Sequence, residues 1–217
     1  MNREEVLQQI RKVALVPVIR ASSADLAIKA AAAIEAGGVS LLEVTMTVPG
    51  AIDVIGAVIK SSQGRVLVGA GTVLDAETAR ACIIAGAQFI VSPALNRGTI
   101  ELCRRYSVAV IPGALTPTEI VTAWEAGADI VKVFPCGALG GPRYLSVLKG
   151  PLPQIKLIPT GGVSLSNAAD YLAAGAYALG VGSDLVDSSA LAKGDMEIIT
   201  ENAKKYVAVV QQSRSKA

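Results

Sequence analysis

The chain has 217 residues, which is enough for one full-sized domain with a deep core. Hydrophobic residues make up 52% of it, yet a charged residue interrupts every apolar run before it reaches membrane-spanning length, so we expect no transmembrane helix and no membrane partner. With 20 Lys and Arg residues against 18 Asp and Glu residues, the formal charge is only +2 and both signs are scattered, which argues against a nucleic-acid partner.

The composition also limits the chemistry. The chain has no histidine, so no imidazole can act as a general base, and the usual ligands of a zinc-dependent lyase are missing. Cys82, Cys103 and Cys136 lack metal-ligand spacing, which is typical of buried thiols in a reduced compartment. The segment Met1 to Leu7 contains acids and resembles no signal peptide. We therefore expect a cytoplasmic protein that uses no metal and no other cofactor.

Short runs rich in Val and Ile alternate with longer alanine-rich segments of helical period, which indicates repeated βα units and a parallel sheet. The pattern predicts strands at Ala14 to Arg20, Leu41 to Thr47, Val66 to Ala70, Phe89 to Ser92, Val108 to Pro112, Ile130 to Phe134, Lys156 to Thr160 and Ala178 to Gly182. Eight such strands favour an α/β fold, a single (β/α)₈ TIM barrel domain over residues 1–217, ahead of an open doubly wound sheet.

A weak internal repeat supports this interpretation. An Ala-Gly pair ends a helical segment before the second, fourth, sixth and eighth strands, with its first glycine at Gly37, Gly86, Gly127 and Gly175. We expect left-handed backbone at these glycines, as at the C′ position of a helix.

Lys132 is the most informative residue, because it interrupts the apolar strand around Val131 and Val133. Removing an ammonium from water is costly, so a buried lysine is commonly neutralised or held by a partner, and a neutral lysine attacks carbonyls to form a Schiff base. The alternative is a lysine near a strand end that extends its ammonium to solvent.

Glu43 is the carboxylate set most deeply in an apolar strand. Inward side chains of the second and sixth strands can meet across the interior of a barrel, so Glu43 is positioned to move protons for Lys132. A plain structural ion pair between the two residues is the alternative.

The remaining candidates lie where predicted strands end, the edge at which barrels carry their chemistry. Glycine-rich turns after the seventh and eighth strands fit a phosphate site built from backbone N–H groups, whereas ordinary loop glycines would look the same. Hydroxyls near strand ends are commonly helix caps, and a terminal arginine either binds an anion or faces solvent. The candidates are Gly161, Gly162, Gly182, Ser183, Thr72, Thr160 and Arg20.

Several motifs, in order along the chain, resemble the 2-keto-3-deoxy-6-phosphogluconate (KDPG) aldolases, a class I family that includes the 4-hydroxy-2-oxoglutarate (KHG) aldolases. The motifs that carry the resemblance are Glu43-Val44-Thr45, Gly69-Ala70-Gly71-Thr72-Val73, Phe89-Ile90-Val91-Ser92-Pro93, Ile111-Pro112-Gly113, Thr116-Pro117-Thr118-Glu119, Lys132-Val133-Phe134-Pro135 and Pro159-Thr160-Gly161-Gly162-Val163.

The resemblance implies a homotrimer that cleaves a phosphorylated keto acid to pyruvate and glyceraldehyde 3-phosphate, or KHG to pyruvate and glyoxylate. Lys132 would form the Schiff base and Glu43 would act as acid and base through a water. Thr72 would contact the pyruvate carboxylate, and Thr160, Pro93 and Phe134 would shape that pocket. Gly161, Gly162, Gly182 and Ser183 would hold the phosphate.

One position departs from the family. Thr47 stands where many members carry an arginine that contacts the substrate carboxylate, so we count Thr47 among the expected substrate-binding residues and ask whether Arg20 supplies the missing charge. Two rival functions remain at this point. A phosphosugar epimerase or isomerase would use Lys132 and Glu43 for proton transfer alone, and a non-catalytic barrel would only bind a phosphorylated ligand.

Overall fold

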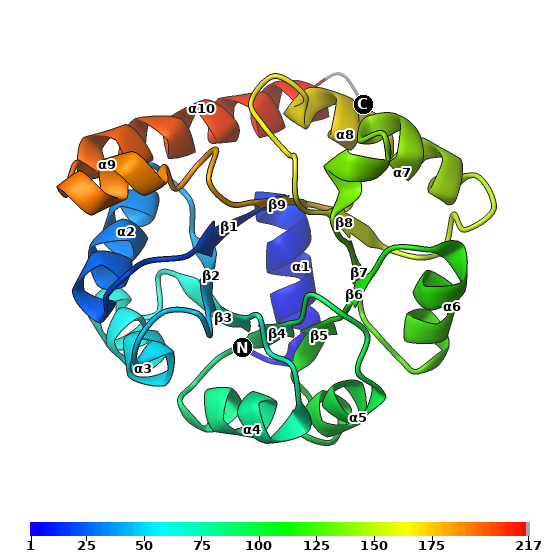
Figure 1. Cartoon of the computed structure of the whole chain (residues 1–217), viewed down its shortest axis with the longest axis horizontal. Coiled ribbons are helices and arrows are strands. Elements are labelled where there is room, and N and C mark those ends of the chain that lie inside the picture. The colour runs from blue at the N-terminus through cyan, green and yellow to red at the C-terminus, as the bar shows by residue number, and fades with distance from the viewer. Residues whose placement is uncertain (216–217) are drawn as a thin grey trace.

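The structure, a computed structural model, describes residues 1–215 and has at its centre a curled parallel sheet (Figure 1). Its larger section has the strand order β5-β4-β3-β2-β1-β9, and its smaller section has the order β6-β7-β8. The strands are β1 (Leu15–Ile19), β2 (Leu41–Thr45), β3 (Leu67–Gly71), β4 (Phe89–Val91), β5 (Ala109–Ile111), β6 (Gly113–Ala114), β7 (Val131–Val133), β8 (Leu157–Pro159) and β9 (Leu179–Val181).

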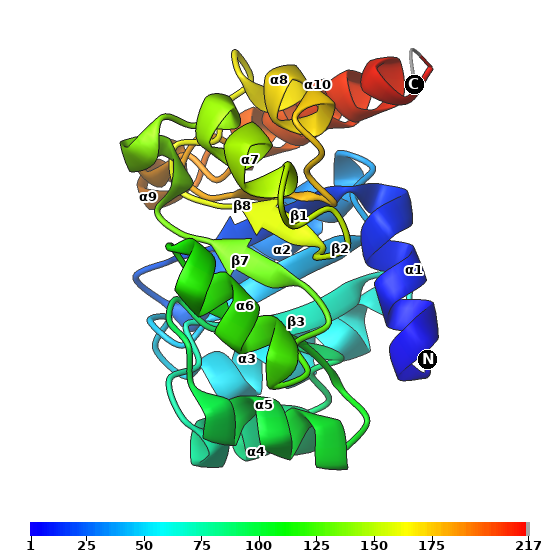
Figure 2. The ribbon, with the colours of Figure 1, turned by 90° about the vertical axis from the view of Figure 1, so that its right-hand side faces the viewer.

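Helices surround the sheet, and α1 lies across one end of it (Figures 1 and 2). The helices are α1 (Arg3–Val13), α2 (Ala24–Ala36), α3 (Ala51–Ser62), α4 (Ala76–Ile84), α5 (Arg97–Arg105), α6 (Pro117–Glu125), the 3₁₀ helix η1 (Cys136–Leu139), α7 (Pro142–Lys149), α8 (Ala168–Ala173), α9 (Ser188–Lys193) and α10 (Met196–Arg214). Within residues 1–215, no helix is long and apolar enough to cross a membrane.

Each predicted strand overlaps an observed strand. Seven of the observed strands are shorter than predicted, whereas β3 has the predicted length but is shifted by one residue and ends at Gly71. The strand predicted to end at Pro112 resumes after it as β6, because proline has no N–H to donate to a ladder. The carbonyl of Pro112 still accepts from the Lys132 N–H at 2.9 Å. The isolated parallel bridge between Thr160 and Gly180 joins the end of β8 to β9.

The strands are buried on both sides, and their alternating side chains form two apolar layers. In β2, Leu41 belongs to the inner layer, whereas Leu42 and Val44 pack outward against the helices. In β7, Val131 and Val133 pack outward as well. The same alternation turns the residues between them, Glu43 and Lys132, toward the interior.

Helix α1 closes the end of the sheet at which the strands begin. Val6, Leu7 and Ile10 of α1 pack into the inner apolar layer. Arg3 donates from Nε to both carboxylate oxygens of Asp129, at 2.9 and 3.1 Å, so an ion pair holds the start of α1 near the start of β7. Helix α1 therefore covers the end of the sheet opposite to the carboxyl ends of the strands (Figure 2).

The expectation for the four repeat glycines is wrong at one of them. Gly86, Gly127 and Gly175 have positive φ, but Gly37 has φ of −76°, and it is the next residue, Gly38, that has φ of +88°. Gly37 is instead a packing glycine. A Cβ atom there would collide with the Ala203 side chain in α10 and lie 2.8 Å from the Thr200 carbonyl oxygen.

We predict that Gly37→Ala lowers the free energy of unfolding by about 1 to 3 kcal/mol, because α2 and α10 must separate to admit the methyl group. Urea titration of the purified protein measures the change. The matched control is Gly56→Ala in α3, where a Cβ atom would lie 3.9 Å from its nearest neighbour, the Ala85 oxygen. Gly56→Ala should gain about 0.5 to 1 kcal/mol from helix propensity. Equal effects of the two substitutions would contradict the packing role of Gly37.

Candidate active site

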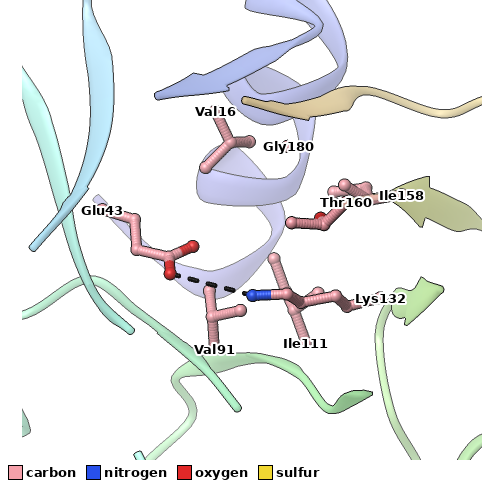
Figure 3. Close-up of a pocket in the computed structure, with 8 residues that line it drawn as sticks. All are labelled: Val16, Glu43, Val91, Ile111, Lys132, Ile158, Thr160 and Gly180. Carbon is pink, nitrogen blue, oxygen red and sulfur yellow. Dashed lines mark ion pairs between the residues drawn. The ribbon is translucent and has the colours of Figure 1, made fainter. Parts of the chain in front are cut away.

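Glu43 and Lys132 face each other across the interior of the curled sheet (Figure 3). Their side chains are 3% and 4% exposed, and Glu43 Oε1 lies 3.9 Å from Lys132 Nζ. That distance is longer than a hydrogen bond. The two opposite charges therefore attract each other, but the side chains do not hold each other in a fixed geometry. Glu43 Oε1 is buried and has no hydrogen-bond partner in the described part of the chain. A buried, unpaired carboxylate oxygen is costly to maintain and is typical of a functional site.

Apolar side chains from several strands wall this pair off from bulk water. The cavity around it is lined by Val16, Glu43, Val91, Ile111, Lys132, Ile158, Thr160 and Gly180 (Figure 3). Such walls strengthen the electrostatic interaction between the two charged groups by lowering the local dielectric. The Phe134 ring adds a further contact, since its centroid lies 5.3 Å from Lys132 Nζ.

Two glycines leave the space that these side chains need. A Cβ atom on Gly71 would collide with the Glu43 carboxylate, and one on Gly180 would collide with the Thr160 hydroxyl. The next residue after Gly71, Thr72, has φ of +57°, which is strained for a β-branched side chain. Strain of this kind persists only where the surroundings hold the residue, and it clusters at functional sites.

Pro93 lies farther along the edge, packed against Gly113 of β6, where a Cβ atom would collide with the Pro93 carbonyl. The buried hydroxyl of its neighbour Ser92 donates to the Ala94 carbonyl at 2.6 Å, so it supports the chain rather than facing the cavity.

The glycine turns after β8 and β9 are the place where the sequence predicts an anion site. Gly161 and Gly162 have φ of +78° and +83°. The N–H groups of Gly161, Gly162, Gly182 and Ser183 donate no hydrogen bond within residues 1–215, so they are free to bind an anion. Arg20 is exposed at the end of β1, and its Nη1 would lie 3.6 Å from a Cβ atom built on Gly182. The guanidinium is therefore beside this site.

Thr47 does not line the cavity. It is exposed in the turn after β2, and its hydroxyl pairs with that of Thr45 at 2.6 Å. Thr45 in turn donates to the Ile19 carbonyl at 3.0 Å, so the Thr47 hydroxyl is the donor to Thr45. These hydrogen bonds hold the ends of β1 and β2 together.

Sequence reasoning missed Gly137, which lies in η1 directly after the lysine strand. Its N–H donates to the Gly161 carbonyl at 2.8 Å, and a Cβ atom on Gly137 would lie 2.9 Å from the Gly162 Cα. The segment after β7 therefore packs on the glycine turn after β8. Only the glycine itself, in the exposed run Gly137 to Gly140, marked this close approach in the sequence.

The cysteines offer no alternative nucleophile. All three are free and buried, and burial raises the pKa of Cys82 to about 11 and of Cys103 to about 12. Burial also raises the pKa of Cys136, so the thiol nearest the site stays protonated at neutral pH. Among the described residues, no three His, Cys, Asp or Glu side chains come together as metal ligands would.

A protein-family comparison matches residues 6–202 to a family described as "KDPG and KHG aldolase". The chain is 35% identical to a 2-dehydro-3-deoxy-phosphogluconate aldolase of Treponema pallidum, over 94% of this chain and 97% of that protein. It is 38% identical to a KHG/KDPG aldolase of Escherichia coli, over 89% of this chain and 90% of that protein.

Solved structures agree with these sequence comparisons. A KDPG aldolase from Legionella pneumophila, crystallised with pyruvate captured as a covalent carbinolamine intermediate, superposes with a TM-score of 0.85 and 30% identity. The match covers 92% of this chain and 96% of that one. On the family match and these relatives, the chain belongs to the KDPG and KHG aldolase family.

Proposed function

We propose that this protein is a class I aldolase that cleaves 2-dehydro-3-deoxy-6-phosphogluconate to pyruvate and D-glyceraldehyde 3-phosphate, with KHG as a second substrate that gives pyruvate and glyoxylate. The observation that carries the proposal is the buried pair of Lys132 and Glu43, whose Nζ and Oε1 atoms are 3.9 Å apart in an apolar cavity. The relatives named for this reaction share the fold over nearly the whole chain.

The reaction follows from the positions of the two side chains. Lys132 gives up a proton to water, its amine attacks the C2 ketone of the substrate, and loss of water gives an iminium. Glu43, directly or through a water, takes the proton of the C4 hydroxyl as the C3–C4 bond breaks, and the electron pair of that bond moves into the iminium to form an enamine. Reprotonation of C3 and hydrolysis of the imine release pyruvate and restore Lys132.

The site around the pair divides between the two ends of the substrate. Thr72, Pro93, Phe134 and Thr160 would surround the pyruvate part, and the free N–H groups of Gly161, Gly162, Gly182 and Ser183 would bind the phosphate. Arg20 is on the phosphate side, because its guanidinium lies beside Gly182. We therefore assign Arg20 to the phosphate rather than to the carboxylate, and we give Thr47 no direct contact with substrate.

The fold supports this assignment if the two sections of the sheet act as one closed (β/α)₈ barrel in a single domain over residues 1–217. Three observations favour closure. Strands β1 and β9, the first and the last, are paired; β5 and β6 are separated only by Pro112; and the Thr160–Gly180 bridge joins β8 to β9. An open doubly wound sheet would leave its edges unpaired.

A homotrimer and a cytoplasmic location are further parts of the proposal. The free cysteines are typical of a reducing compartment.

A designed cage made by fusing symmetric oligomeric domains superposes on this chain with a TM-score of 0.84, at 32% identity. Exposed apolar side chains at Ile52, Leu74 and Ile84 offer area for contacts between subunits. Sedimentation equilibrium should give the mass of three chains, and the mass of one chain would contradict the trimer.

We predict that Lys132→Met lowers kcat by at least about 10⁴-fold and that Glu43→Gln lowers it by about 10² to 10⁴-fold, because the first removes the nucleophile and the second removes the base. Pyruvate release coupled to lactate dehydrogenase measures both. Lys156→Met is the control, since Lys156 is exposed at the opposite end of the sheet, over the Tyr177 ring. A Lys132→Met variant with more than a tenth of the wild-type rate would rule out the Schiff-base mechanism.

We predict that Arg20→Ala raises KM for the phosphorylated substrate about 10 to 100-fold, the loss expected for one charge-assisted contact. The same variant should leave the affinity for pyruvate unchanged, which a competition assay against the cleavage reaction measures. Arg105→Ala, on the exposed end of α5, is the control for loss of a positive charge. Weaker pyruvate binding in Arg20→Ala would instead place the guanidinium at the carboxylate.

A further inference from the structure

The loops after β8 and after β9 carry the two halves of the proposed anion site. The Asp184 carboxylate, in the loop after β9, connects it to the loop after β8. Asp184, next to Ser183, accepts from the Leu165 N–H at 3.1 Å. Leu165 lies three residues after Gly162 in the other loop. Together with the Thr160–Gly180 bridge, this hydrogen bond holds the two loops side by side.

The buried Tyr206 holds the Asp184 carboxylate through a second hydrogen bond. The Tyr206 hydroxyl, on α10, donates to the same Asp184 oxygen, Oδ2, at 2.6 Å. Tyr206 is 0% exposed and packs within the outer apolar layer, so its ring is held by the core. Burial and the adjacent carboxylate raise the pKa of the Tyr206 phenol, which keeps the O–H in place as a donor at every working pH. Helix α10 thus reaches the mouth of the site, although it packs on the outside of the sheet (Figure 1).

Asn167 extends the same connection to the glycine turn itself. Its side-chain oxygen accepts from the Ser164 N–H at 2.9 Å, and its side-chain nitrogen donates to the Gly162 carbonyl at 2.9 Å. The path from Tyr206 to Gly162 therefore consists of consecutive hydrogen bonds and one short stretch of backbone. Gly162 has positive φ and no side chain to anchor it, so it depends on such contacts for its position.

We propose that Asp184 and Tyr206 are positioning residues that align the loops after β8 and β9 for binding the substrate phosphate. This inference rests on the proposed function. Neither residue needs to touch the substrate. The role of Asp184 is to accept those two hydrogen bonds, and its negative charge is not required.

Two reactions of the same enzyme separate this role from the catalytic chemistry. Cleavage of the phosphorylated substrate needs the loops. Exchange of the pyruvate methyl protons with solvent deuterium, followed by NMR, needs only the imine and the enamine formed at Lys132 with Glu43 as base. Pyruvate has no phosphate, so its exchange does not depend on the alignment of the two loops.

The variants are Tyr206→Phe, which deletes only the hydroxyl, Asp184→Ala, which deletes the acceptor, and Asp184→Asn, whose amide oxygen can accept both hydrogen bonds without the charge. We expect Tyr206→Phe and Asp184→Ala to raise KM for the phosphorylated substrate about tenfold, as for a binding group displaced by a fraction of an ångström, with the exchange rate unchanged. Asp184→Asn should restore a near wild-type KM. Tyr177→Phe, which deletes a hydroxyl that donates to Leu7 in α1, should change neither reaction.

Two results would overturn the inference. Equal losses in cleavage and exchange would mean that Tyr206 and Asp184 serve stability alone. A lower KM in Asp184→Asn, with Tyr206→Phe unchanged, would mean that Asp184 acts through its charge. Absence of exchange in the wild-type protein would instead refute the proposed aldolase chemistry, so the two failures are distinguishable.

Discussion

The ion pair between Lys132 and Glu43 is the constraint on which the rest of the site depends. Both side chains are nearly inaccessible, and burial of charged groups is costly unless opposite charges lie close together. Here the separation of 3.9 Å leaves the partners near enough to offset part of that cost, yet too far apart to satisfy each other as a hydrogen bond would. The unpaired Glu43 oxygen keeps the carboxylate available for proton transfer.

The fold creates this pair through the period of its strands. Because side chains alternate across a strand, Glu43 and Lys132 turn inward while their neighbours pack against the helices. Gly71 and Gly180 then remove side chains that would fill the same space. Helix α1 covers the end at which the strands begin, so the pair can be reached only from the carboxyl ends of the strands. The packing that buries the pair therefore also determines the side from which a substrate enters.

Much of this was predictable from the sequence, because strand period and composition are local properties. The Val and Ile runs located every strand except β6, and Lys132 and Glu43 were conspicuous because charged residues are rare in such runs. Gly161 and Gly162 were expected to form a turn after the seventh predicted strand, and both have positive φ there. The strand ends were less accurate, since pairing with neighbours decides where a ladder stops: Pro112 interrupts a strand that continues beyond it.

Other features depend on contacts between distant segments, which a single sequence does not reveal. Gly37 was expected to have left-handed backbone, but it is required by the approach of α10, more than 160 residues later. The sequence left open whether Arg20 binds a carboxylate or a phosphate, and the pairing of β1 with β9 brings its guanidinium beside Gly182. Tyr206 and Asp184 had no sequence signal, because a core tyrosine and a loop aspartate are common.

Reduction with borohydride in the presence of pyruvate, followed by peptide mass mapping, tests the central claim most directly, because only an imine is trapped by this chemistry. We predict a single reduced pyruvate adduct on Lys132 of the folded protein. An unmodified Lys132, or an adduct confined to exposed lysines such as Lys156, would show that the buried pair does not perform Schiff-base chemistry.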